Sequence, residues 1–276
     1  MPPVSEPSVP ESSAVQLYCL DSGEPGSGEL PLIILHGLLG SADNWRSHMR
    51  AWQDQRRVVA VDLRNHGRSP HADGMSYLSM SDDVVALMDR LSIERAHVLG
   101  HSMGGKVAMS LARRNPGRVA TLTVADIAPV AYQHGHDRIF AAMRELQQGH
   151  PKDRREADAL LARHIESRPV RLFLATNLQR DGDELALRVD LDRIMDGYAD
   201  IIAPPAGQAP FDGPSMVLRG EQSDYVEDAM LPTLRGVLPG ARLITLKEAG
   251  HWLHADQPDA FRQAVERFLG AHPHGA

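Results

Sequence analysis

The chain has 276 residues, 42% of them hydrophobic, which suits one α/β domain with an insertion better than two independent domains. Its formal net charge of -7 leaves no basic surplus to neutralise phosphates, which argues against nucleic acid as a partner. No apolar run approaches the ~20 residues of a membrane helix, so we expect a soluble protein without membrane insertion.

The N-terminal residues 1–13 have neither a basic start nor an apolar core, and we expect a flexible tail and not a secretory signal. Cys19 is the single cysteine, so no internal disulfide can form, and we expect it to be a small buried residue of a cytoplasmic protein.

The first predicted strands are residues 14–20, which alternate in polarity, and 31–35, which are continuously apolar like a buried parallel strand. The second strand leads into His36-Gly37-Leu38-Leu39-Gly40. Gly37 would let the backbone turn so that the amide of Leu38 points at a site and forms half of an oxyanion hole. The alternative is an ordinary glycine-rich loop between a strand and a helix.

A helix over 43–52 and a buried strand over 57–63 follow, and the strand ends in the polar segment 62–69. Such a segment lies where the strand ends of open parallel sheets meet ligands. Asp62 and Arg64 are therefore candidates for catalysis, although a hydrogen-bonded loop that fixes neighbouring turns is the favoured interpretation of both.

A helix over 77–91 and a strand over 96–99 lead to Gly100-His101-Ser102-Met103-Gly104, after which a helical pattern begins at once. This is the order strand, sharp turn, helix. A serine on such a turn exposes its hydroxyl above the sheet, and the small residues two before and two after it are needed where strand and helix nearly touch. The pattern predicts that Ser102 is a catalytic nucleophile.

The strand 119–124 ends near Asp126, after which the alternation of strands and helices breaks from about residue 134 to 210. The pattern there predicts helices over 137–148, 153–165, 170–178 and 191–202. We expect residues 131–210 to form a helical cap over the site, and 14–130 with 211–272 to form the core. The core resumes with strands at 215–219 and 241–246 and helices at 227–238 and 258–269.

Among fourteen histidines, position selects the base. In an order of serine, acid and histidine, the base lies on the loop after the last strand, and His251 follows Gly250 there. His254 is expected to be a loop or capping residue, and His36 and His101 to shape the site. Spacing leaves two acids open, namely Asp224 and Asp126.

Five segments together resemble the YbfF-like esterases of the α/β-hydrolase superfamily, which are related to the mitochondrial abhydrolase-domain proteins. They are His36-Gly-Leu-Leu-Gly-Ser-Ala-Asp-Asn-Trp45, Asp62-Leu-Arg-Asn-His-Gly67, Gly100-His-Ser-Met-Gly-Gly-Lys106, Asp126-Ile-Ala-Pro129 and Gly250-His-Trp-Leu-His-Ala-Asp256. The resemblance runs from about residue 15 to 270 and is weakest over the expected cap.

The resemblance implies the α/β-hydrolase fold: a mostly parallel twisted sheet flanked by helices, with the cap inserted after the strand ending near Asp126. It implies hydrolysis of acyl esters or acyl thioesters without a cofactor. It also implies that Asp126 serves as the acid and that Ser223 sits beside the histidine, while Asp224 stays as the alternative acid.

The predicted function is that of a serine hydrolase acting on a small-molecule acyl ester or thioester. Ser102, His251 and Asp126 are the predicted triad, and the amides of Leu38 and Met103 the predicted oxyanion hole. His36, Gly37, His101 and Trp252 are expected to contact substrate.

Other functions use the same scaffold. Cofactor-free haloperoxidases or perhydrolases, lactonases and carbon–carbon bond hydrolases keep the triad, and a hydrolase-fold ligand receptor would be a non-enzymatic alternative. A metal site is not expected, because His134, His136 and His164 lack a supporting cysteine or carboxylate cluster. The oligomeric state is left open.

Overall fold

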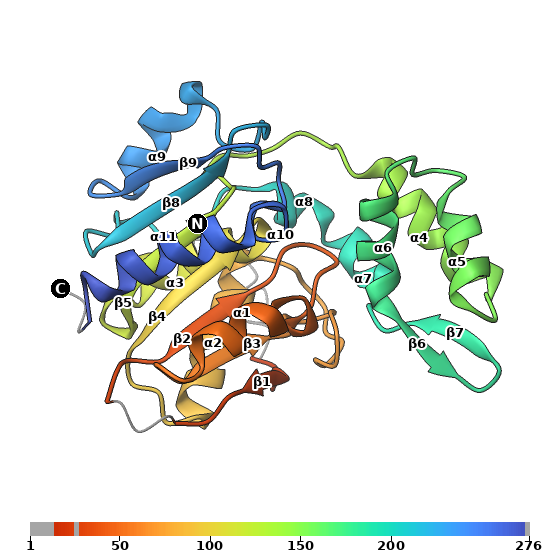
Figure 1. Cartoon of the computed structure of the whole chain (residues 1–276), viewed down its shortest axis with the longest axis horizontal. Helices are drawn as coiled ribbons and strands as arrows, with labels where there is room; N and C mark the ends of the chain where they lie inside the picture. The colour runs from red at the N-terminus through yellow and green to blue at the C-terminus, as the bar shows by residue number, and fades with distance from the viewer. Residues whose placement is uncertain (1–13, 25–27, 274–276) are drawn as a thin grey trace, which may run out of the picture.

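The computed structural model describes residues 14–24 and 28–273, and within them a seven-stranded sheet forms the centre of the molecule (Figure 1). The strand order is β1-β3-β2-β4-β5-β8-β9, and every pairing is parallel except that of β1 with β3. The strands are β1 (Cys19–Asp21), β2 (Leu32–Leu35), β3 (Val58–Val61), β4 (Ala96–His101), β5 (Val119–Ala125), β8 (Ser215–Gly220) and β9 (Arg242–Leu246). The mostly parallel sheet confirms the predicted fold class.

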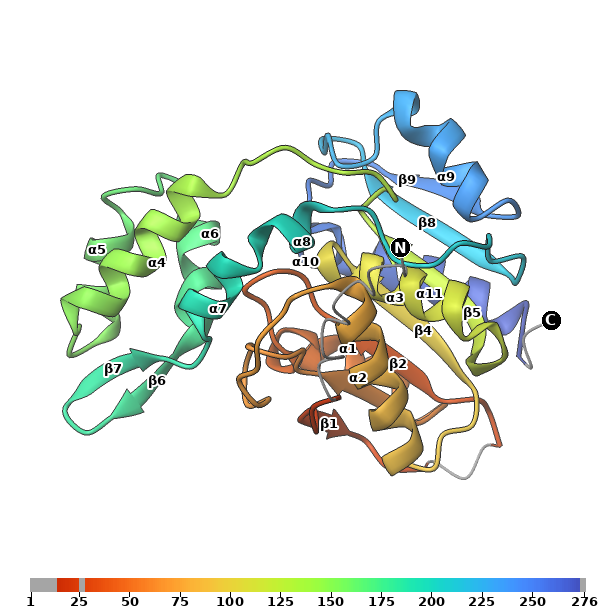
Figure 2. The ribbon, with the colours of Figure 1, turned by 180° about the vertical axis from the view of Figure 1, so that it is seen from behind.

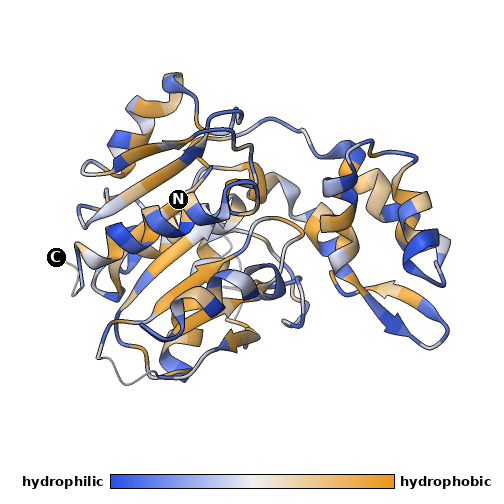
Figure 3. Cartoon of the chain, in the orientation of Figure 1, coloured by the Kyte–Doolittle hydropathy of each residue, from blue (hydrophilic) through white to orange (hydrophobic). Residues whose placement is uncertain are grey.

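The central strands are apolar on both faces because helices cover both faces. In β2, Ile33 and Leu35 point into one hydrophobic core, and Leu32 and Ile34 into the other. Figure 3 shows this concentration of hydrophobic residues along the strands. As Figures 1 and 2 show, α2 (Tyr77–Arg90), α3 (Met103–Arg114) and α9 (Leu231–Val237) cover one face, and α1 (Arg46–Trp52) and α11 (Pro258–Gly270) the other.

The order of the sheet places a crevice next to β2. The chain passes from β2 to β3 on one side and then crosses to β4 on the other, so the strand order reverses between β2 and β4. Ligands of open α/β sheets bind outside the carboxyl ends of the strands at such a point. The loop after Leu35 and the turn after His101 both lie there.

The segment between β5 and β8 forms a lobe beside the sheet (Figure 1). Its elements are α4 (Asp137–Gly149), α5 (Arg154–Leu161), α6 (Arg168–Leu174), β6 (Leu178–Asp181), β7 (Glu184–Leu187), α7 (Leu191–Asp196) and α8 (Tyr198–Ile202).

The hairpin β6–β7 differs from the expected run of helices. The helix predicted to reach residue 178 ends at Leu174, and the strand pair follows. Gly182 has φ 56° at the first position of the two-residue turn between Asp181 and Glu184, a conformation that glycine adopts without strain. The helix predicted over 191–202 is divided at Gly197.

Other boundaries move by a few residues. The first strand is Cys19–Asp21 and does not begin at residue 14, and α1 is preceded by a 3₁₀ turn at Ala42–Trp45. The helix predicted over 227–238 consists of a 3₁₀ turn at Asp228–Met230 and α9. The expected tail 1–13 lies outside the described residues. Of the helices that the structure describes, none has the length and apolarity to cross a bilayer.

Candidate active site

Ser102 occupies a strained turn between β4 and α3, with φ 51° and ψ -122°. The turn requires glycine on either side of the serine. A Cβ on Gly100 would lie 2.1 Å from the carbonyl oxygen of Gly104, and a Cβ on Gly104 would lie 2.3 Å from that of Leu35. Strand and helix therefore approach one another so closely that only glycine fits, and the strain holds the serine at the carboxyl edge of the sheet.

His251 lies between Ser102 and Asp126. Its Nε2 is 3.0 Å from Ser102 Oγ, and its Nδ1 is 2.8 Å from Asp126 Oδ2. The histidine comes from the loop after β9, and the aspartate directly follows β5 with φ 52°. Three segments far apart in the sequence thus form one hydrogen-bonded chain of hydroxyl, imidazole and carboxylate.

Asp126 is fully buried, and the last residue of β8 and the loop after it supply further donors to its carboxylate. Oδ1 accepts a hydrogen bond from the backbone N–H of Gly220 at 2.9 Å, and Oδ2 accepts one from the hydroxyl of Ser223. Charge-assisted bonds of this kind stabilise the ionised carboxylate in a buried position.

Asp224, the other candidate acid, is exposed, and among the described residues no hydrogen bond connects it with His251. Of the two aspartates that spacing left open, Asp126 is the one that the fold brings to the histidine.

Tyr225 is a neighbour of the histidine that the sequence did not single out. Its ring stacks on that of His251, with the ring centroids 3.8 Å apart and the planes 21° from parallel. The hydroxyl of Tyr132 donates to the carbonyl of Tyr225 at 2.5 Å. No motif marks Tyr225, and its position two residues after Ser223 was the only available signal.

The loop after β2 lies against the serine turn. A Cβ on Gly37 would lie 3.1 Å from Ser102 Cβ and 3.0 Å from His101 Nδ1, so the backbone of Gly37 packs directly on the turn. Met103 is the first residue of α3, and an amide at that position has no acceptor in its own helix. Within residues 14–24 and 28–273, no hydrogen bond occupies the N–H of Leu38 or Met103.

Two buried histidines hold this loop in place. The Nε2 atoms of His36 and His66 accept hydrogen bonds from the amides of Leu63 (3.0 Å) and Leu39 (3.1 Å). Their Nδ1 atoms donate to the carbonyls of Gly37 (2.7 Å) and Arg64 (2.9 Å). Burial lowers the pKa of His36 to about 4 and that of His66 to about 3, so both are neutral, as an accepting ring nitrogen requires.

His101 and His254 belong to the same buried surroundings. His101 Nε2 donates to the carbonyl of His251 at 2.8 Å, and burial lowers the pKa of His101 to about 3. His254, in the short helix α10 (Leu253–Asp256), stacks on Trp45 with ring centroids 4.5 Å apart. Expected to be a loop or capping residue, His254 instead lies in a helix and packs inside the core beside the site.

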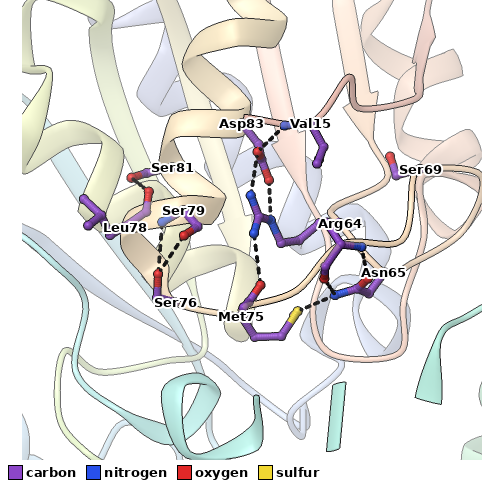
Figure 4. Close-up of polar contacts among 12 residues, drawn as sticks. Val15, Arg64, Asn65, Ser69, Met75, Ser76, Leu78, Ser79, Ser81 and Asp83 are labelled. Carbon is purple, nitrogen blue, oxygen red and sulfur yellow. Dashed lines mark hydrogen bonds and ion pairs between the residues drawn. The ribbon is translucent and has the colours of Figure 1, made fainter. Parts of the chain in front are cut away.

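Asp62 and Arg64 have structural partners. Asp62 accepts hydrogen bonds from the amides of Ala42 (2.6 Å) and Arg68 (2.8 Å). Arg64 forms a fully buried, two-pronged ion pair with Asp83, at 2.6 and 2.8 Å, as Figure 4 shows. These contacts agree with the favoured interpretation of both residues as fixing neighbouring turns.

Ser102 opens into a cavity between the core and the lobe that follows β5. Phe173 of α6 lies across it, with its ring centroid 5.7 Å from that of Trp252, and Asn177 Nδ2 donates to the carbonyl of Leu39 at 2.8 Å. The predicted substrate contacts His36, Gly37, His101 and Trp252 all line this cavity, together with Ser102 and His251.

Of the lobe's histidines, His136 also lines this cavity and is half-buried, with Nδ1 2.6 Å from the hydroxyl of Tyr198. The sequence favours an exposed position for His136, because no cysteine or carboxylate cluster accompanies it. The structure shows a half-buried side chain instead. His134 is exposed, and His164 contacts Glu145 at 2.5 Å. In the part of the chain that the structure describes, no three histidine, cysteine or carboxylate side chains gather as metal ligands would.

Comparison with known proteins identifies the class. Residues 31–258 match the family model of the alpha/beta hydrolase fold, so the chain belongs to this family. It is 39% identical to mouse sn-1-specific diacylglycerol lipase ABHD11 over 253 residues, which is 88% of this chain and 82% of the relative. It is 35% identical to Escherichia coli esterase YbfF, over 87% of this chain and 92% of the relative.

The solved structure of a marine microorganism esterase matches with a TM-score of 0.88 at 39% identity, covering 93% of this chain and 100% of the other. These relatives confirm the predicted family and the predicted class of enzyme, the carboxylic ester hydrolases.

Proposed function

We propose that the protein hydrolyses carboxylic esters through a covalent acyl-enzyme formed on Ser102, with His251 as the base and Asp126 as the acid that orients it. The observation that carries this proposal is the chain of contacts from Ser102 Oγ through both nitrogens of His251 to Asp126. A serine hydroxyl is a weak nucleophile until an adjacent imidazole takes its proton, and this geometry supplies one.

In the first half of the reaction, Ser102 Oγ attacks the ester carbonyl while His251 Nε2 takes the hydroxyl proton. The amides of Leu38 and Met103 stabilise the negative oxygen of the tetrahedral intermediate. When the bond to the leaving group breaks, His251 gives its proton to the departing alcohol. Water then attacks the acyl group, His251 takes the water's proton, and Ser102 regains its hydrogen as the acid leaves.

The substrate class that we propose is a small acyl ester or acyl thioester with apolar groups. The apolar side chains that line the cavity around Ser102 support it, among them Ile139, Val170 and Phe173. These three come from the segment 131–210, which we propose to be a cap over the site. Lipase and esterase activities, by which the relatives are named, agree with such a substrate. We also propose a cytoplasmic location, supported by the single cysteine.

The test is the Ser102→Ala variant. It should lower the kcat for a nitrophenyl butyrate by at least about 10⁴-fold, the usual effect of removing a nucleophile. A fluorophosphonate should label the wild-type protein and not the variant, and circular dichroism checks that the variant folds. Unchanged turnover in a folded variant would refute the assignment of Ser102. Labelling of Ser102 without turnover of any ester would favour a ligand receptor.

A further inference from the structure

Ser102 borders two cavities, which share Leu38 and His136 as walls. The first, which we call the His251 cavity, is the one between the core and the lobe. The second, the Lys106 cavity, lies along α3 and is lined by Met103, Lys106, Ile127, Tyr77, Tyr132 and Ile201. Its volume is about 40 Å³.

The chemistry of the proposed function, on which this inference rests, assigns one half of the ester to each cavity. His251 must give its proton to the leaving alcohol, so the alcohol lies in the cavity that the His251 ring lines. The acyl group remains bonded to Ser102 and extends into the other cavity, which contains Met103.

One wall of the Lys106 cavity is an unusual group. Lys106 is 1% exposed, and no salt bridge pairs it with a carboxylate among the described residues. Its Nζ donates instead to three backbone carbonyls, those of Val130 (2.8 Å), Ile202 (3.3 Å) and Ala203 (2.6 Å). It also lies over the rings of Tyr77 and Tyr132, 5.6 and 4.6 Å from their centroids.

These three carbonyls belong to the two places where the chain crosses between the sheet and the lobe. Val130 lies on the way out from β5, and Ile202 and Ala203 lie on the way back toward β8. Further hydrogen bonds connect the same face of α3 with the segment that returns toward β8. Ser110 Oγ accepts from the amide of Ala206 at 2.9 Å, and Arg113 Nε donates to the carbonyl of Ala209 at 2.8 Å. Positions 106, 110 and 113 share one face of a helix.

A buried amine without a carboxylate is costly, because burial disfavours its charged form and lowers the pKa of Lys106 to about 7. An apolar side chain would fill the position at a lower cost in folding free energy. The N–H donors of Lys106 therefore indicate a role beyond packing. We propose that Lys106 sets the length of acyl chain that the enzyme accepts, by pinning both crossings of the chain beside the Lys106 cavity.

The dimensions indicate short acyl groups. Lys106 follows Ser102 by four residues, about one helical turn or ~5.4 Å along α3. One enclosed water needs about 10–15 Å³ of a cavity, so this one holds about three or four non-hydrogen atoms. Acetyl and butyryl groups fit in that space, whereas an octanoyl group would have to displace the pinned backbone.

The experiment measures kcat/KM for nitrophenyl acetate, butyrate, hexanoate and octanoate. For the wild type we expect kcat/KM at least about tenfold lower for octanoate than for butyrate, since chain atoms that do not fit cost about that much or more. Lys106→Met, which keeps the length of the side chain without its donors, should bring the two values within about threefold. Lys106→Ala should do the same.

Three other variants sharpen the result. Ile201→Ala enlarges the same cavity without touching Lys106 and should also favour octanoate, which keeps the test open if the Lys106 variants do not fold. Phe173→Ala enlarges the His251 cavity and should leave the ratio of butyrate to octanoate unchanged. Lys247→Met, at an exposed lysine, should leave both the activity and the ratio unchanged.

The outcomes separate this inference from the proposed function. If the wild type hydrolyses none of the four esters, the proposed function fails. If it hydrolyses them but shows no preference for short chains, the inference is wrong and the function stands. If folded Lys106→Met keeps the wild-type ratio, pinning by the ammonium does not set the chain length, and that part of the inference is refuted.

Discussion

Side chains from two different segments hold the imidazole of the candidate site. Tyr225 stacks on the ring of His251, and Asp126 contacts its Nδ1. The carboxylate is held in turn by the amide of Gly220 and the hydroxyl of Ser223. The imidazole is therefore fixed in the orientation that presents Nε2 to Ser102, which is the preorganisation that acyl transfer requires.

The acid can be tested by two matched variants. Asp126→Asn should lower kcat by about 10³–10⁴-fold, because an amide can donate to Nδ1 and so favour the wrong tautomer of His251. Asp224→Asn changes an exposed carboxylate in the loop after β8 and should leave kcat within about twofold. Steady-state kinetics on nitrophenyl butyrate decide between them. A large loss in Asp224→Asn alone would show that Asp126 is not the acid.

At the scale of elements, buried polar contacts fix the loops that surround the site. The ion pair of Arg64 and Asp83 joins the loop after β3 to α2, and both side chains have no exposed surface. Asp83 also accepts a hydrogen bond from the amide of Val15 at 2.8 Å, and Arg64 Nη1 donates to the carbonyls of Asp73 and Gly74, each at 3.0 Å. Figure 4 shows the pair at the centre of this arrangement.

Removing one partner of this pair should be strongly destabilising. Asp83→Ala leaves the Arg64 guanidinium buried without its carboxylate, which costs about 3–5 kcal/mol of the free energy of unfolding. The matched control is Asp82→Ala, whose carboxylate is 45% exposed and pairs with Arg114 at the surface, and it should cost less than about 1 kcal/mol. Urea denaturation measures both. Equal losses in the two variants would contradict the role given to the buried pair.

At the scale of the whole molecule, the residues that the structure describes include six buried histidines in neutral form. Burial lowers the pKa of His36 and His48 to about 4, lowers that of His66, His97 and His101 to about 3, and lowers that of His254 well below its usual value. In the unfolded chain the pKa of histidine is about 6.5. Below that pH the unfolded state binds protons that the folded state does not, so stability falls as the pH falls.

The contribution of a single histidine to this pH dependence of stability can be measured. Each such histidine contributes about 1.4 kcal/mol per pH unit from pH 6.5 down to its folded pKa. His97 lies in β4, with Nδ1 2.9 Å from Thr121 Oγ1, and does not line the cavities at Ser102. His97→Leu should reduce the slope of unfolding free energy against pH by about 1.4 kcal/mol per unit between pH 6 and 4.

The control for this variant is Val98→Ala, which weakens the same strand without removing a titrating group. Its loss of unfolding free energy should be the same at every pH, so the slope of unfolding free energy against pH should stay unchanged. Urea denaturation at a series of pH values measures the slopes. An unchanged slope in His97→Leu would show that His97 is not one of the histidines that couple folding to pH.

The alternation of strands and helices was readable in the sequence because it depends on local patterns. Continuous apolar runs marked β2 and β3, mostly apolar segments marked β4 and β5, and their order along the chain predicted a mostly parallel sheet. The hairpin β6–β7 was missed because its strands are short and mostly exposed, so that their composition resembles that of neighbouring helices. Only the glycine turn at Gly182 gave a signal.

The sequence by itself determined the family and the position of the serine turn, because the order of strand, Gly100-His101-Ser102-Met103-Gly104 and helix is a pattern local to one segment of the chain. The tertiary structure decided which residues meet there. His251, Asp126 and Tyr225 follow three different strands, and spacing along a chain does not tell which carboxylate two loops bring to an imidazole. Lys106 likewise reads as a helix residue until the fold lays both crossings of the chain across its ammonium.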